Sequence, residues 1–242
     1  MPEIGLIIAA GGSGRRFGGG IPKQFRLLGR RSVLEHSLRA FEGIPRLRQA
    51  VVAVPPGDMI RRGSWCLQQR FRLTVHVVAG GRERQDSVRN ALRAFSPPVD
   101  VVLIHDAVRP LVDRATILRV MRAAARYGAA VPGVSMRDTV KQEGRPGFVG
   151  KTLDRTGLWS IQTPQGFRRR LLVRAHGRGA RMGLKGTDDA FLAEVLGIPV
   201  RIVEGSRENL KITTPEDLRW ARALLRGRSR LRTGRRVLHV SG

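Results

Sequence analysis

Residues 6–25 read LIIAAGGSGRRFGGGIPKQF, and this stretch decides the fold expected for the chain. The apolar run Leu6–Ala10 has the composition of a β-strand that is buried on both faces. A glycine-rich segment follows at once, with Arg15 and Arg16 inside it and Lys23 shortly after it. Glycine lets a backbone approach a ligand closely, and the N–H groups of such a loop can hold phosphate oxygens that nearby cations neutralise. The stretch therefore predicts a strand that leads into an anion-binding loop.

Two common phosphate-loop patterns are excluded here. The pattern G-x-x-x-x-G-K-[ST] fails because no Lys-Ser or Lys-Thr follows a glycine within this loop. The pattern G-x-G-x-x-G, started at Gly12, fails at Phe17. The loop is thus neither a Walker loop nor a dinucleotide fingerprint. A glycine-rich surface turn with solvated arginines remains an alternative.

Beyond the loop, short apolar runs alternate with amphipathic segments. Such alternation is typical of β-α units with right-handed crossovers. Ser32 and Glu35 predict a capping box at the start of the first helix. We expect further strands over residues 50–54, 74–79, 100–104, 129–134 and 200–203, and helices over 32–38, 84–94 and 115–127 and from 168, 188 and 215. The expected fold class is α/β, with a doubly wound, mostly parallel, Rossmann-like sheet.

The alternation is interrupted after Val134. Residues 138–141 and 148–153 are short and partly polar, and glycine and proline lie between them. This pattern predicts a β-hairpin. We expect it to project from the sheet as an arm over about residues 137–154.

We expect one domain over residues 1–226, because the sequence shows neither an internal repeat nor a linker. The run Arg226–Arg236 is densely basic. It follows the last amphipathic segment, so we expect residues 227–242 to form a mobile basic tail.

The composition limits the compartment in which the protein works. Cys66 is the only cysteine among the 242 residues, so an internal disulfide is impossible and a reducing compartment is expected. The first strand begins within a few residues of Met1, and no apolar run is long enough to span a membrane. We therefore expect a cytoplasmic protein without membrane contact.

The formal net charge is +26, from 45 Lys and Arg against 19 Asp and Glu, which favours polyanionic partners. A general preference for arginine on solvated faces explains the same excess, since lysine is rare in this chain. Aromatic residues make up only 5%, which is few for a surface that stacks on bases. A basic nucleic-acid-binding protein stays as an alternative from a different class, and no nucleic-acid partner is expected.

Three loops are expected together, because ligands of open parallel sheets bind at the carboxyl ends of the strands. They are residues 11–23, 80–87 and 105–107. The first supplies backbone donors and cations, and the second places glycines before a helix N-terminus. The third puts Asp106 at a strand end, a common place for a Mg²⁺ ligand beside substrate phosphates. With no Cys/His zinc cluster and no G-x-S-x-G elbow, this set favours transfer at phosphorus.

Seven motifs follow one another in a characteristic order. They are residues 10–16 (AGGSGRR), 22–24 (PKQ), 80–88 (GGRERQDSV), 105–110 (HDAVRP), 138–141 (DTVK), 154–159 (DRTGLW) and 209–213 (NLKIT). This ordered set resembles the 2-C-methyl-D-erythritol 4-phosphate cytidylyltransferase family, from roughly Ile4 to Leu225. Leu210 departs from the family's usual isoleucine, which is an apolar exchange.

The resemblance implies a reaction in non-mevalonate isoprenoid precursor synthesis. The phosphate of methylerythritol phosphate attacks the α-phosphorus of CTP, so that CDP-methylerythritol forms and pyrophosphate leaves. It also implies that Arg16 and Lys23 are catalytic cations and that Asp106 holds Mg²⁺ or another divalent cation. The substrate-positioning residues would be Arg109, Thr139, Arg155 and Lys211. The implied CTP-binding residues are Ala10, Gly11, Gly12, Gly14, Arg16, Lys23, Gly80, Gly81, Ser87, Asp106 and Ala107.

The resemblance further implies a homodimer whose arms clasp, so that Thr139 and Arg155 enter the partner's site. A cytidylyltransferase for another polyol phosphate, such as ribitol 5-phosphate, would share the CTP loops and differ in the arm. That sister activity stays as the nearest alternative.

The resemblance also implies a cytosine slot lined by Gly80, Gly81, Ser87 and Ala107, and this slot predicts selectivity for CTP over ATP and GTP. Walls built from the backbone of Gly80, Gly81 and Ala107, with the small Ser87, exclude a purine by steric overlap and can hydrogen-bond a cytosine edge. Pyrophosphate release should therefore be fast with CTP and slow with either purine nucleotide at matched concentrations. Equal turnover with ATP and CTP would contradict the predicted slot.

Overall fold

The computed structural model describes residues 2–11, 17, 21–58, 71–96 and 98–234. Residues 12–16 and 18–20 of the predicted glycine loop lie outside this set, among them the predicted site residues Gly12, Gly14 and Arg16, and so does Cys66. The positions predicted for these residues are therefore not tested by the fold.

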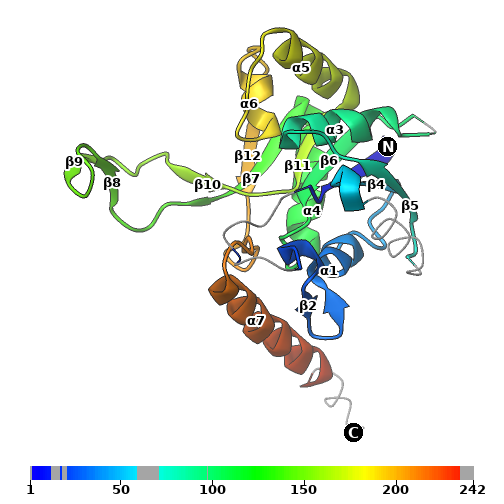
Figure 1. The fold of residues 1–242 in the computed structure, drawn as a ribbon, viewed down its shortest axis with the longest axis horizontal. Helices are drawn as coiled ribbons and strands as arrows, with labels where there is room; N and C mark the ends of the chain where they lie inside the picture. Colours follow the sequence, from blue (N-terminus) through cyan, green and yellow to red (C-terminus); the bar gives the residue numbers. More distant parts are fainter. Residues whose placement is uncertain (1, 12–16, 18–20, 59–70, 97, 235–242) are drawn as a thin grey trace, which may run out of the picture.

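Within the described residues, eight strands form one central sheet (Figure 1). They are β1 (Ile4–Ala9), β4 (Leu47–Val54), β5 (Thr74–Ala79), β6 (Val101–Asp106), β7 (Ala129–Ser135), β10 (Trp159–Ile161), β11 (Gln165–Arg168) and β12 (Arg201–Glu204). Their spatial order is β10-β7-β11-β6-β1-β4-β5, with β12 paired to β7. The pairs β1–β4, β1–β6, β4–β5 and β7–β12 are parallel. The mostly parallel α/β sheet is thus confirmed.

Within the central sheet, β11 was not expected from the sequence. β11 lies antiparallel between β6 and β7. The short strand is recognised by its place in the sheet, because its four residues are too few for a periodic pattern.

Six α-helices are seen in the described part of the chain. They are α1 (Val33–Arg39), α3 (Arg84–Arg93), α4 (Arg114–Tyr127), α5 (Arg169–Arg181), α6 (Asp189–Glu194) and α7 (Pro215–Gly234). Two 3-10 turns, η2 (Lys23–Phe25) and η3 (Pro56–Asp58), and the small ribbon of β2 (Leu27–Leu28) with β3 (Arg31–Ser32) complete the body. None of the described helices is long and apolar enough to cross a membrane.

Half of the predicted capping box forms at α1. The Ser32 hydroxyl accepts the Glu35 N–H at 3.1 Å. The Glu35 carboxylate instead pairs with Arg39 at 2.8 Å and Arg31 at 3.1 Å. The helix start is as expected, and the two arginines determine where the glutamate side chain points.

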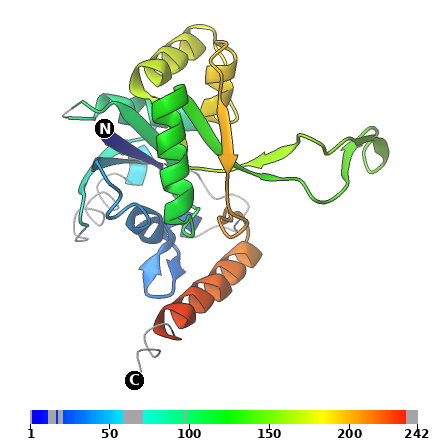
Figure 2. The same cartoon turned by 180° about the vertical axis from the view of Figure 1, so that it is seen from behind.

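Side chains alternate between the two faces of the sheet, as the strand geometry requires. In β1, Leu6 and Ile8 pack into the core beneath α1 and α4, and Ile7 packs into the core beneath α3, α5 and α6. The helices cover both faces, with α4 in front of the sheet in Figure 2. Burial on both faces explains the uninterrupted apolar composition of β1.

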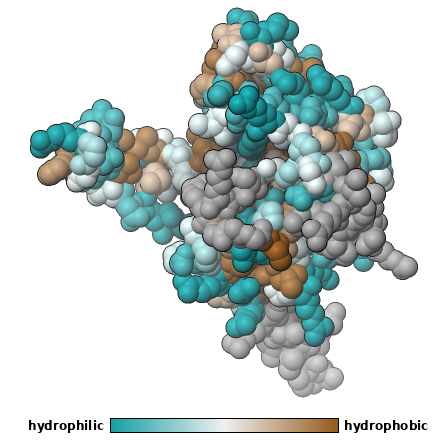
Figure 3. Space-filling view, viewed as in Figure 1, coloured by the Kyte–Doolittle hydropathy of each residue, from teal (hydrophilic) through white to brown (hydrophobic). Residues whose placement is uncertain are grey.

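A two-stranded arm projects from the sheet at the left of Figure 1. It consists of β8 (Val140–Glu143) and β9 (Val149–Leu153), which pair antiparallel. Most of its side chains are exposed, including the apolar Phe148 at 61% and Val149 at 64% (Figure 3). The chain thus carries apolar side chains on an extension that has no core of its own.

The C-terminal segment differs from the prediction. We expected a mobile tail from residue 227, but α7 continues to Gly234. Arg228 lies against the body, where it donates to Glu208 at 2.8 Å and to the Leu111 carbonyl at 2.9 Å. The basic residues begin within the helix because arginine is a good helix former, so charge density alone did not mark the helix end. Residues 235–242 lie outside the described residues.

Candidate functional site

The candidate site lies at the carboxyl ends of β1 and β6. The strand order reverses there, since β1 is flanked by β4 on one side and β6 on the other. Such a switch point is where open α/β sheets bind ligands. The register places Ala9 beside Asp106, and the Ala107 N–H donates to the Ala9 carbonyl at 3.1 Å.

A cavity of about 460 Å³ opens at this point. It is lined by Ala9, Ala10, Gly11, Lys23, Gln24, Gly81, Arg82, Glu83, Arg84, Ser87, Asp106, Ala107, Val108 and Lys211. Residues from loops far apart in sequence therefore share one wall. We call this cavity the cleft.

The predicted site residues fall into four groups. Ala10, Gly11, Lys23, Gly81, Ser87, Asp106, Ala107 and Lys211 line the cleft. Gly80 and Arg109 stand directly behind it, where Gly80 is packed against Ser87 and Arg109 faces Asp106 at 3.9 Å. Gly12, Gly14 and Arg16 lie outside the described residues, and Thr139 and Arg155 are on the arm.

Neither Thr139 nor Arg155 lines the cleft of its own chain. Thr139 is an exposed residue just before β8. Arg155 follows β9, and its guanidinium donates to the Arg137 carbonyl across the base of the arm. The single chain therefore does not bring these two side chains to the other predicted site residues.

The loop before α3 is held by its own hydrogen bonds. The Ser87 hydroxyl accepts the Gly81 N–H at 3.0 Å and donates to the Glu83 carbonyl at 3.2 Å. Glu83 and Asp86 form a capping box at the start of the helix. A Cβ on Gly81 would lie 2.2 Å from the Asp86 Cβ, so the close turn requires glycine. Ser87 thus shapes this wall of the cleft as well as lining it.

Asp106 is surrounded by cations. Its Oδ2 is 2.8 Å from the Lys211 ammonium, and its Oδ1 accepts from Arg84 Nε at 3.3 Å. Burial alone would raise the pKa of Asp106, but Arg84 and Lys211 outweigh it and hold the pKa well below its ordinary value. The carboxylate is therefore ionised, and the cations around it exceed its single charge.

Arg84 bridges two carboxylates. Its Nη1 donates to Asp189 Oδ2 at 2.6 Å, while its Nε faces Asp106. Asp189 is fully buried, and its Oδ1 is 3.0 Å from His176 Nε2. Burial disfavours the charge on Arg84, but Asp189 and then Asp106 outweigh it and raise the pKa of the guanidinium.

His105 is a structural residue in this fold. Its ring is fully buried, with Nε2 at 3.0 Å from the Arg109 carbonyl and Nδ1 at 3.0 Å from the Thr163 hydroxyl. Burial lowers the pKa of His105 to about 4. The ring is therefore neutral at physiological pH, and it points into the core rather than into the cleft.

The segment that carries Lys211 is anchored on both sides. The Ile212 N–H donates to the Val108 carbonyl at 2.8 Å, and Arg109 donates to the Asn209 carbonyl at 2.7 Å. Asn209 is buried and donates to the Thr163 carbonyl at 2.8 Å. These bonds bring the chain beyond β12 back to the end of β6, which is why Lys211 reaches Asp106.

Sequence reasoning missed several of these residues. Arg84 was part of a quoted motif but received no role, and Asp189 was not singled out; it directly follows Asp188, the N-cap of α6. A signal that could have pointed to Asp189 is that it is a second acidic residue directly after Asp188, in a chain with only 19 Asp and Glu residues. Asn209 also belongs to a quoted motif but received no role. Thr163 carries no pattern in the sequence, since it joins segments that are remote from one another.

Metal binding at the cleft would depend on Asp106. Among the described residues, no group of three or more His, Cys, Asp and Glu side chains could hold a metal ion. Mg²⁺ commonly takes one or two carboxylates together with substrate phosphates and water. One ionised carboxylate beside an anion-attracting cleft fits that mode of binding.

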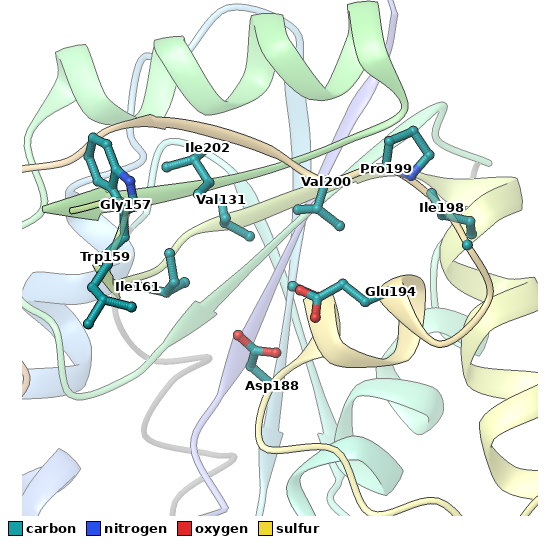
Figure 4. A pocket seen from close by; sticks show the side chains of 13 residues that line it. Val131, Gly157, Trp159, Ile161, Asp188, Glu194, Ile198, Pro199, Val200 and Ile202 are labelled. Carbon is teal, nitrogen blue, oxygen red and sulfur yellow. The ribbon is translucent and has the colours of Figure 1, made fainter. Parts of the chain in front are cut away.

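A second cavity, of about 590 Å³, lies between β7, β10, β12 and α6 (Figure 4). Its wall is mostly apolar, with Trp159, Ile161 and Val200 on it and the carboxylates of Asp188 and Glu194 at one side. None of the predicted site residues lines it. Its larger volume does not make it the candidate site, because the cations and the strand-end carboxylate are in the cleft.

Fold and cleft together define a nucleotide-binding α/β protein with its site at the switch point of a parallel sheet. The family model for IspD, 2-C-methyl-D-erythritol 4-phosphate cytidylyltransferase, matches residues 4–227. The chain belongs to this family, and it is therefore a nucleotidyltransferase. Membership supports the first interpretation over the ribitol 5-phosphate alternative, and it supports an enzyme over a nucleic-acid-binding protein.

Individual relatives agree with the family match. The chain is 43% identical to the 2-C-methyl-D-erythritol 4-phosphate cytidylyltransferase of Pelotomaculum thermopropionicum, over 94% of this chain and 96% of the relative. It is 44% identical to the enzyme of the same name from Syntrophus aciditrophicus, over 93% and 97%. The crystal structure of the Thermus thermophilus enzyme superposes with a TM-score of 0.76 at 38% identity, over 91% of this chain and 98% of that one.

Gly81→Ala should destabilise the wall of the cleft. The new Cβ would overlap Asp86, with backbone atoms of that residue at 3.1 Å and 3.2 Å, so the loop has to move. We expect a loss of roughly 1–3 kcal/mol in the free energy of unfolding, measured by urea titration, and a higher KM for CTP. The control is Gly57→Ala, whose Cβ would meet nothing within 4 Å. Equal stability and equal KM in the two variants would show that the turn does not need glycine.

Proposed function

We propose that the protein carries out the reaction of its family, the transfer of CMP from CTP to 2-C-methyl-D-erythritol 4-phosphate with release of pyrophosphate. The observation that carries the proposal is the cluster of cations around Asp106 at the end of β6. The cleft wall also includes Lys23 and Arg82, so cations outnumber carboxylates there. A triphosphate and a phosphate monoester are the kind of ligands that this charge excess attracts.

The catalytic work is assigned to preorganised charge. The α-phosphate gains negative charge as the new P–O bond forms and as pyrophosphate leaves. Lys23, on the wall of the cleft, and Arg16, in the glycine loop, stabilise that charge in this proposal. Cations fixed before the reaction begins are often the largest catalytic contribution.

The attacking phosphate is already an anion, so no general base is required. The nearest histidine, His105, is buried and neutral and forms hydrogen bonds to Arg109 and Thr163. Proton transfer is therefore not assigned to any side chain of the cleft.

Mg²⁺ or another divalent cation is proposed to be held by Asp106. When bound, such an ion supplies Lewis-acid stabilisation of the phosphate oxygens. In the structure Asp106 is paired with Lys211, whose side chain is 44% exposed and has room to turn toward a phosphate. Arg84 and Arg109 would keep the Asp106 carboxylate in place while Lys211 turns toward the phosphate.

The base slot is proposed to consist of Gly80, Gly81, Ser87 and Ala107. Ala107 is buried and its carbonyl accepts from Ser37 at 2.8 Å, so this wall is tied to α1. Rigid walls with small side chains suit a pyrimidine. The cytoplasm is the proposed compartment, on the ground of the single cysteine.

A homodimer is proposed to complete the site. Thr139 and Arg155 lie on the exposed arm and not in the cleft of their own chain. The arm exposes Phe148 and Val149, and an isolated two-stranded ribbon is marginally stable in water. A two-fold clasp with a second chain would cover these side chains and bring Thr139 and Arg155 to the partner's substrate.

Asp106→Asn should reduce kcat roughly 100- to 1,000-fold, the typical cost of losing one preorganised electrostatic group. It should also weaken the dependence of the remaining rate on Mg²⁺. Pyrophosphate release measured over a Mg²⁺ series tests both effects. The matched control is Asp113→Asn at the N-cap of α4, which keeps a capping side chain and should leave kcat nearly unchanged. A normal, Mg²⁺-dependent rate in Asp106→Asn would remove this carboxylate from the mechanism.

Mixing two inactive variants tests the shared site. Lys23→Ala and Arg155→Ala homodimers should each be nearly inactive, because each lesion damages both sites. After subunit exchange, a heterodimer has one site with both lesions and one with neither. The heterodimers should recover activity toward half of the wild-type value.

Exchange itself is followed with two differently tagged subunits, so that a negative result can be interpreted. If exchange is complete and no activity returns, Lys23 and Arg155 act in the same chain's site. The proposal that Arg155 acts on the partner's substrate would then be wrong.

A further inference from the structure

Arg84 is held at two points on its planar guanidinium. One point is Asp106 at the end of β6, through Nε, and the other is Asp189 at the start of α6, through Nη1. Two anchors on a rigid fork determine its orientation, whereas one anchor leaves it free to rotate. Asp189 thus limits how Arg84 can face the cleft.

Asp189 is itself fully anchored. Its Oδ1 is paired with His176, which is 4% exposed on α5. Its backbone N–H donates to the Gln165 side chain at 3.2 Å. A buried carboxylate is costly unless it is paired and hydrogen-bonded, and this one satisfies both conditions while it does not touch the cleft.

The charge of Asp189 also matters for Asp106. A guanidinium shared between two carboxylates neutralises each of them only in part. Without Asp189, the charge of Arg84 would fall on Asp106 alone, and that carboxylate would be less available to its other partners. Loss of Asp189 should therefore disturb Asp106 in two ways, through the orientation of Arg84 and through the distribution of its charge.

We propose that Asp189, supported by His176, is a positioning residue that sets the orientation and charge sharing of Arg84 at Asp106. This inference rests on the proposed role of Asp106. It adds a contribution from α5 and α6 to a site that is otherwise built at the ends of β1 and β6. Asp188, the neighbour of Asp189, faces the second cavity instead (Figure 4).

The competing explanation is that Asp189 only holds α6 against α3 and does not act through the orientation of Arg84. Gln85, the next residue, provides a direct comparison, because its side chain crosses the same junction through hydrogen bonds that do not involve the Arg84 guanidinium. It donates to the Leu184 carbonyl at 2.7 Å and accepts the Gly186 N–H at 3.0 Å. Gln85→Ala should loosen the junction as much as a change at Asp189 but leave the guanidinium in place.

A double-mutant cycle in kcat tests the proposal. Asp189→Asn should lower kcat roughly tenfold, the range typical of residues that support a site from behind. In the Arg84→Ala background, Asp189→Asn should lower kcat by less than about twofold, because its effect passes through Arg84. Gln85→Ala should keep kcat within about threefold of wild type. The proposal is wrong if the losses at positions 84 and 189 multiply, or if Gln85→Ala is as slow as Asp189→Asn.

A second readout uses the metal-free protein and no substrate. The Nε–H resonance of Arg84, identified by its absence in Arg84→Lys, reports the guanidinium directly by ¹⁵N NMR. It should shift or broaden in Asp189→Asn and stay unchanged in Gln85→Ala. An unchanged resonance in Asp189→Asn would overturn the proposal even if the rate fell.

Removal of a buried charge can prevent folding, so His176 provides a milder test. His176→Ala removes one anchor of Asp189 and should slow kcat several-fold, whereas His176→Gln retains a donor and should be close to wild type. Equal rates in these two variants would contradict the proposal. Wild type and Asp106→Asn are assayed in parallel, so failure of the proposed function shows separately as an inactive wild type or an active Asp106→Asn.

Discussion

The parallel pairing of β1 with β6 is the constraint on which the site depends. It places Ala9 beside Asp106, so the glycine loop and the strand-end carboxylate leave the sheet at the same point. The pairing is stable because both strands are buried on both faces. A shift of one residue would turn the side chain of Asp106 to the other face of the sheet, away from Lys211 and Arg84.

The buried carboxylates near that point are neutralised by cations that contact them directly. The chain carries a net charge of +26, yet Asp106 and Asp189 are buried among Arg84, Arg109, Lys211 and His176. Each of these side chains comes from a different element or loop. Buried ions of this kind are tolerated only when they are paired, so the pairing restricts how α3, α5 and α6 sit on the sheet.

Much of the architecture was predictable because the signals are local. The strand Thr74–Ala79 has the predicted bounds, and α3, α4 and β7 begin and end within about one residue of those expected. Described residues of all three loops predicted to meet line one cleft. The expected start of the tail was wrong where local signals conflict, because the basic residues from 227 to 234 belong to α7.

The amino-acid sequence by itself determined the α/β class, the place of Asp106 at a strand end and the ordered motifs of the family, because each depends on neighbouring residues or on a pattern in chain order. Only the tertiary structure decided that β11 lies between β6 and β7, that Lys211 reaches Asp106, and that Arg84 joins Asp106 to Asp189. These contacts link residues as far as 105 positions apart, from Arg84 to Asp189. No local pattern encodes such a pair, since it forms only when packing of the core has brought the elements together.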